Sequence, residues 1–248
     1  MSTAMARQKF KLGTTLFSFM NEYWSREYTL EQVIARVAEL GLGPGLELVG
    51  FSHIRGFPGC SDDFAAQFRD WMAKYRLEPS CLSLNADAAI RRGTLMSDAE
   101  AAAYFEAQIR TAAKLGFPVV KTQLAASPRV IEMLLPLVEK LGIKIGPELH
   151  APWTVDSPTV MAYRELYARL KSPLLGFVPD FGSCAQMLPP GYVRYLRDKG
   201  MPQDLLDLAA QTWKGPGDVQ QRREEFHRRA AAQGAEPSVI SALSVLFA

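Results

Sequence analysis

The stretch Lys144-Ile145-Gly146-Pro147-Glu148-Leu149-His150 decides how the chain is expected to fold and where its chemistry is expected to lie. An apolar run, Leu141 to Ile145, leads into a carboxylate and an imidazole that are two residues apart. In an extended strand such residues point to the same face. Glu148 and His150 are therefore predicted to lie side by side at the carboxyl end of a strand, the end at which parallel barrels carry their functional groups.

Short apolar strands and amphipathic helices alternate six times along the chain around this stretch. Besides the stretch itself, the predicted strands are residues 10–19, 46–51, 80–84, 119–124 and 174–179. The helices carry start and stop signals: Thr29 begins one that Gly41 ends, and Ser97 and Glu100 have the spacing of a capping box. This alternation predicts parallel βαβ units whose strands all end at the same edge, and hence an α/β barrel.

Residues 189–248 follow a different pattern. Helical periodicity covers residues 191–199, 202–213 and 219–233, and a fourth helix begins at Pro237. None of these segments reads as a buried strand, so the prediction is a barrel of about six βα units without recognisable seventh and eighth strands. We expect residues 1–248 to form a single barrel domain, with 189–248 as a helical tail of that domain.

Composition narrows the class of protein. The chain has 248 residues, 48% of them hydrophobic and 22% charged, which suits one large globular domain. A net charge of +2 favours neither a nucleic-acid partner nor a membrane surface, and no segment approaches the roughly 20 apolar residues of a membrane span. Three widely spaced cysteines without a C-x-x-C pair, and a polar start without a signal peptide, predict a cytoplasmic protein.

Glu148, His150 and Asp180 are the strongest candidates for chemistry. Glu148 and Asp180 come at the ends of neighbouring predicted strands, so their carboxylates should face one mouth and suit a hard divalent ion such as Mg²⁺ or Mn²⁺. Such an ion would act as a Lewis acid, and His150 could serve as a general base beside it. A structural alternative has Asp180 capping the next turn and Glu148 paired with Lys121.

Polar side chains at other strand ends could bind the hydroxyl groups of a sugar. Asn21 and Glu22 follow the first predicted strand, Asn85 follows the third, and Lys121 and Gln123 share one face of the fourth. Trp153 could supply an apolar or stacking wall. For each of these residues, ordinary barrel packing remains an equally good interpretation. His53 is expected in a loop.

The order of these motifs, with Glu148-Leu149-His150 followed by Pro179-Asp180-Phe181, resembles the xylose-isomerase-like sugar phosphate isomerase/epimerase TIM barrels. More narrowly, several segments resemble the α subunit of bacterial C-glycoside deglycosidases. These segments are TLFSFMNEY (15–23), LGLGPGLE (40–47), GF (50–51), IRGFP (54–58) and ELHAP (148–152).

The resemblance implies a metal site, a base and a reaction. By this resemblance we expect a divalent ion, Mn²⁺ before Mg²⁺. In the family, four side chains coordinate the ion: a Glu, an Asp, a His from the seventh strand and a Glu from the eighth. Glu148 and Asp180 match the first two ligands, the other two have no counterpart, and His150 matches the base. A 3-oxo-C-glycoside would chelate the ion and lose the proton next to its carbonyl. It would then expel its aryl group by β-elimination of the C–C bond, in an enzyme that also has a small β subunit.

Two other functions remain open from the sequence. A keto-sugar isomerase or epimerase would use the same ion and the same enediolate, and would return a proton to carbon instead of losing a leaving group. A non-catalytic sugar-binding or truncated scaffold protein would hold no metal. Homo-oligomers are compatible with each of these functions.

Overall fold

The computed structural model describes residues 11–85, 93–123, 126–150, 153–184, 188 and 190–247. The chain divides into two compact units, Met1–Ser183 and Cys184–Ala248, and each has a hydrophobic core of its own. The predicted helical tail thus coincides closely with the second unit. Its assignment to the same domain as the barrel stays a prediction.

In the described part of the first unit, six strands form one parallel sheet in which each strand pairs with the next along the chain. They are β1 (Gly13–Thr15), β2 (Gly45–Val49), β3 (Glu78–Ser83), β4 (Val119–Thr122), β5 (Lys144–Leu149) and β6 (Val178–Pro179). This order confirms the predicted incomplete α/β barrel.

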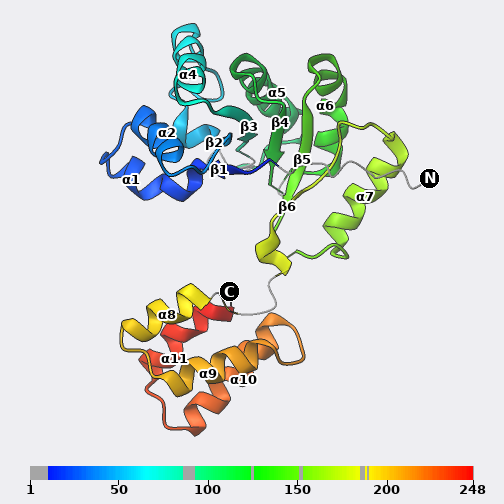
Figure 1. Ribbon diagram of the computed structural model, residues 1–248. Coiled ribbons are helices and arrows are strands. Elements are labelled where there is room, and N and C mark those ends of the chain that lie inside the picture. The colour runs from blue at the N-terminus through cyan, green and yellow to red at the C-terminus, as the bar shows by residue number, and fades with distance from the viewer. Residues whose placement is uncertain are drawn as a thin grey trace, which may run out of the picture. The chain divides into compact units, whose positions relative to one another are not determined.

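The helical elements described up to Cys184 are, in chain order, the 3-10 helix η1 (Leu16–Phe19), α1 (Met20–Trp24), α2 (Leu30–Glu39), α3 (Gly50–His53), α4 (Asp62–Tyr75), α5 (Asp98–Leu115), α6 (Pro128–Leu141), α7 (Pro158–Leu170) and the 3-10 helix η2 (Phe181–Cys184). The long helices α2, α4, α5, α6 and α7 each lie between two consecutive strands in the chain, and Figure 1 shows them on the outer side of the sheet. The predicted capping signals are confirmed, since Thr29 with Gln32 begins α2 and Ser97 with Glu100 begins α5 through reciprocal side-chain bonds to the backbone.

Alternation along the strands separates the core from the concave face of the sheet. Leu46 and Leu48 of β2 are fully buried in the hydrophobic core, whereas Glu47 between them is part-exposed. Strand β4 repeats the pattern with buried Val120 and part-exposed Lys121. Because successive side chains of a strand point to opposite faces, the charged residues lie on the face away from the core.

The first predicted strand is wrong in its length. Among the described residues 11–19 of the predicted strand 10–19, β1 covers only three, and the chain turns into η1 at Leu16; Phe10 lies outside the described residues. Thr15 causes this early end, because its hydroxyl accepts a hydrogen bond from the backbone N–H of Phe17 at 3.2 Å and so caps the turn. Strand β2 likewise ends at Val49, two residues earlier than predicted, where α3 begins.

Every regular element in the described part of the second unit is helical, as predicted. The elements are α8 (Pro190–Asp198), α9 (Gln203–Trp213), α10 (Val219–Ala232), α11 (Pro237–Leu243) and the 3-10 helix η3 (Ser244–Phe247). Leu206, Phe226 and Leu243 are almost fully buried at its centre. Asp218 and Gln221 form a capping box that begins α10.

Within the described ranges, no helix combines the length and the apolar character that crossing a membrane requires.

Candidate active site

The concave face of the sheet carries a cavity of about 900 Å³ within the first unit. Residues from both edge strands of the sheet contribute to its walls, since Thr15 of β1 and Asp180 after β6 both line it. Charged side chains of the middle strands, Glu47, Lys121 and Glu148, line it as well. The cavity therefore gathers predicted site residues from strands that are far apart in the sequence.

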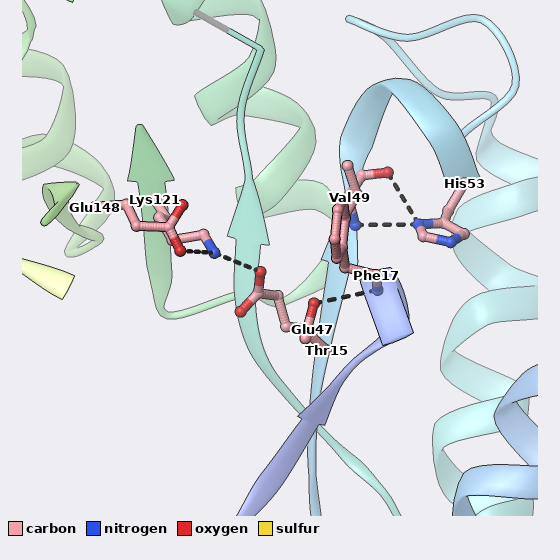
Figure 2. A network of polar contacts seen from close by, with 7 residues as sticks. All are labelled: Thr15, Phe17, Glu47, Val49, His53, Lys121 and Glu148. Atoms are coloured by element: carbon pink, nitrogen blue, oxygen red, sulfur yellow. Dashed lines mark hydrogen bonds and ion pairs between the residues drawn. The ribbon is translucent and has the colours of Figure 1, made fainter. Parts of the chain in front are cut away.

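Lys121 lies at the centre of a three-residue charge cluster that joins β2, β4 and β5. Its Nζ is 2.9 Å from Glu47 Oε1 and donates a hydrogen bond of 2.8 Å to Glu148 Oε1, and Figure 2 shows the ammonium group between the two carboxylates. The side chains are 12%, 17% and 23% exposed for Lys121, Glu47 and Glu148, so solvent screens these interactions only in part.

The cluster holds Lys121 in its charged form. Burial alone would lower the pKa of Lys121, but the attraction of Glu47 and Glu148 outweighs it and the net shift is upward. Cys81 on β3 lies opposite Glu47 in the strand register, and burial raises the pKa of its thiol, so it stays protonated. The cluster is thus one cation between two anions, with a net charge of −1.

Glu148 lies in β5, Asp180 directly follows the neighbouring strand β6, and both line the same cavity. Asp180 follows β6, its N–H donates to Leu149 O at 2.9 Å, and its Oδ1 accepts a hydrogen bond of 2.7 Å from the Gly182 N–H. Both contacts of the structural alternative are therefore observed: Asp180 caps the turn after β6, and Glu148 pairs with Lys121.

The carboxylate oxygens of Glu148 and Asp180 are ligands of the type that hard divalent cations prefer. Across the residues that the structure describes, however, no group of three His, Cys, Asp or Glu side chains stands close enough together to hold an ion. Glu148 and Asp180 therefore fit as part of a ligand set and supply no more than two of its side chains.

His150 and Trp153 form a separate contact just beyond β5. Their rings meet edge to face with centroids 5.9 Å apart, and the backbone N–H of Trp153 donates a hydrogen bond of 3.1 Å to the backbone carbonyl oxygen of His150. His150 is part-buried, but it is not among the described residues that line the cavity with Glu148. Its position one residue past the strand end accounts for this difference, because strand alternation no longer dictates its direction.

The remaining predicted sugar ligands follow their strands in the chain, and they are not among the described residues that line the cavity. Asn21 and Glu22 lie in α1, and Gln123 is exposed after β4. Asn85 is tied to α5: its Nδ2 donates to Tyr104 Oη at 3.2 Å, and its backbone exchanges two bonds with the Gln108 amide. Their role as sugar ligands stays a prediction.

His53 is not the loop residue that the sequence suggests. It ends α3 and is 2% exposed, with Nδ1 3.1 Å from Val49 N and 3.0 Å from Val49 O. Burial lowers its pKa to about 4, against an opposing hydrogen bond with the Val49 backbone. The ring packs against Tyr23 and turns away from Lys121 (Figure 2). His53 is therefore a neutral structural residue and no acid or base at neutral pH.

Glu47 is the site residue that sequence reasoning missed. It stands alone as a charge in the apolar strand Gly45-Leu46-Glu47-Leu48-Val49. A carboxylate within a buried strand is costly unless it is paired, and that anomaly was the signal that could have identified it. Its partner Lys121 lies two strands away, so spacing along the chain does not reveal the pair.

The fold defines the class of this protein. A xylose isomerase-like TIM barrel protein from Mycobacterium smegmatis, solved in complex with magnesium, superposes with a TM-score of 0.51 and 12% identity, covering 99% of this chain and 100% of that one. Together with the strand order, this likeness shows the xylose isomerase-like barrel fold. No family model matches the chain.

Curated relatives narrow the class to a family. A C-glycoside deglycosidase alpha subunit of Arthrobacter globiformis is 42% identical over 204 residues, which cover 82% of this chain and 56% of that protein. A 3'-dehydrocarminate deglycosidase alpha subunit of a Microbacterium species is 41% identical over 203 residues, covering 82% and 58%. A second protein of A. globiformis with the first name is 37% identical over 238 residues, covering 96% and 67%. The chain belongs to the C-glycoside deglycosidase alpha subunit family, and it spans about three fifths of the length of the relatives it matches.

Proposed function

We propose that the chain acts in a metal-dependent enzyme that cleaves the C–C bond of 3-oxo-C-glycosides. The observation that carries the proposal is that Glu148 of β5 and Asp180, which directly follows the neighbouring strand β6, line one cavity in a member of the deglycosidase alpha subunit family. The relatives' names support the substrate class, because one of them is named for a 3'-dehydro glycoside. The relatives are named alpha subunits, which supports a partner chain, and we propose that this partner is a small beta subunit. Assembly into homo-oligomers is compatible with this proposal.

Glu148 and Asp180 would hold the ion, Mn²⁺ in the first place and Mg²⁺ in the second. Such an ion would supply Lewis acidity at the keto oxygen of the sugar. Further ligands would have to join the two carboxylates, since hard divalent ions take about six or more donor atoms. The three widely spaced cysteines, which include no C-x-x-C pair, agree with a cytoplasmic location for such an enzyme.

The chain's own residues would move the proton and hold the sugar. His150 would accept the proton from the carbon next to the carbonyl, and the electron pair of that bond would form the new C=C bond. The bond to the aryl carbon would break with its electron pair, and that carbon would take up a proton. Trp153 would help to orient the His150 imidazole through the edge-to-face contact of the two rings. Asn21, Glu22, Asn85, Lys121 and Gln123 would bind sugar hydroxyls.

The test is aglycone release from a 3-oxo aryl C-glucoside. The substrate is incubated with the chain, any co-purifying partner and Mn²⁺, and the released aglycone is measured by chromatography. Wild type should release the aglycone, and Glu148→Gln and Asp180→Asn should release none. Lys114→Met, which removes an ion pair with Asp62 outside the cavity, should keep the wild-type rate. Wild-type conversion to an isomeric sugar that keeps its aryl group would replace the proposal with the isomerase alternative. Binding without turnover in all variants would point to the non-catalytic one.

A further inference from the structure

Lys121 supplies Glu148 with a positively charged partner. Its ammonium group already donates to Glu148 Oε1 at 2.8 Å, and this carboxylate is only 23% exposed. A divalent ion that binds Glu148 must therefore share this carboxylate with a fixed positive charge or displace that charge from it. Two cations a few ångströms apart in a partly buried cavity repel each other strongly.

Glu47 provides the means by which Lys121 can give up Glu148. The second carboxylate lies 2.9 Å from the same Nζ and is 17% exposed, on a strand two positions away from β4 in the sheet. If Glu148 turns toward an ion, Lys121 keeps a counter-charge and does not become an unpaired buried cation, which would be costly. Glu47 also adds a negative charge to the cavity, which favours any cation there.

We propose that Lys121 is a positioning residue that competes with the divalent ion for Glu148, and that Glu47 retains Lys121 when Glu148 turns to the ion. The inference rests on the carboxylate pair of the proposed function, and it assigns a role to Glu47, which that function leaves unused. Opposite effects follow for the two partners. Removing the charge of Lys121 should strengthen ion binding, whereas removing the charge of Glu47 should weaken it, because Lys121 then depends on Glu148 alone.

The experiment is a titration of the full chain with MnCl₂ at neutral pH, with free Mn²⁺ measured by its electron paramagnetic resonance signal. Lys121→Met should bind Mn²⁺ at least about tenfold more tightly than wild type, and Glu47→Gln about tenfold more weakly. The matched control is Lys11→Met, which removes a charge from the same cavity at a lysine that pairs with Glu78 and is 72% exposed. Screening by solvent should keep its effect within about twofold.

A purely structural role for the cluster predicts a different result. Loss of a packed ion pair would loosen the cavity in both variants, and Mn²⁺ affinity would fall in each. If Lys121→Met fails to fold by circular dichroism, Lys121→Gln keeps a hydrogen-bond donor without the charge and should show the same gain. The inference is overturned if the folded Lys121 variants bind Mn²⁺ no more tightly than wild type. It is also overturned if neither wild type nor any variant binds Mn²⁺.

The inference and the proposed function fail in distinguishable ways. If wild type binds no Mn²⁺ and Lys121→Met does, the competition is upheld and the metal dependence proposed for this chain falls. If wild type binds Mn²⁺ and both variants bind with the wild-type affinity, the metal proposal stands and the competition is refuted.

Discussion

The buried imidazole of His53 makes a quantitative prediction about stability and pH. Its pKa lies near 4 in the folded chain, against 6.5 for an ordinary histidine. Between these values the unfolded chain binds a proton that the folded chain does not, so stability must fall as pH falls through this window. At 1.36 kcal/mol per pH unit, the complete loss is about 3.4 kcal/mol below pH 4. Between pH 7 and pH 5, the contribution of His53 to the free energy of unfolding should fall by about 2 kcal/mol.

Urea unfolding at pH 7 and at pH 5 measures this effect when wild type is compared with His53→Gln, which cannot titrate. The variant should be less stable at pH 7 because it loses a packed ring, but it should lose about 2 kcal/mol less than wild type on acidification. Exposed carboxylates contribute equally to both proteins and cancel in the difference. His227→Gln, the same change in the second unit, should keep the wild-type pH dependence of the first unit. Identical pH dependence in wild type and His53→Gln would refute the reasoning.

Three further outcomes follow from packing and chemistry. Gly146→Ala should destabilise the first unit by about 1–3 kcal/mol in urea unfolding, because a Cβ there would overlap the carbonyl oxygen of Gly176. Gly176→Ala, whose Cβ would meet no atom within 4 Å, is its control, and an equal loss in both would contradict the account. Phe226→Ala should destabilise the second unit by about 3–5 kcal/mol in calorimetry, and a shifted transition of the first unit would argue against separate cores. His150→Ala should lower the rate of aglycone release about 10²–10⁴-fold while Mn²⁺ binding persists, and full activity would exclude His150 as the base.

Local signals in the sequence predicted the fold well. Thr29 and Ser97 begin the helices that their capping patterns indicate, and the six apolar segments pair in chain order as parallel strands. The errors arose where a local hydrogen bond competes with strand propensity. The apolar run from Leu16 to Phe19 has the composition of a strand, but the side chain of Thr15 caps a 3-10 turn there instead.

The candidate site was predicted only in part, because its central contacts are long-range. Glu148 and Asp180 could be placed at one cavity from the alternation of strands and helices alone. The pairing of Lys121 with Glu47 depends on the curl of the sheet across β3, which periodicity does not contain. The prediction that His53 lies in a loop was wrong because β2 ends early at Val49. The helix α3 begins there, and His53 is the buried last residue of that helix.

We propose above that Glu148 and Asp180 together bind the ion of a sugar enzyme. Anomalous diffraction at the manganese edge, from crystals grown with Mn²⁺, tests it most directly. The account predicts one strong peak within coordination distance of both carboxylates, at about 2.0–2.6 Å, with Lys121 displaced toward Glu47. A peak that touches neither carboxylate, or no peak in a preparation that cleaves the 3-oxo-C-glycoside, would contradict it.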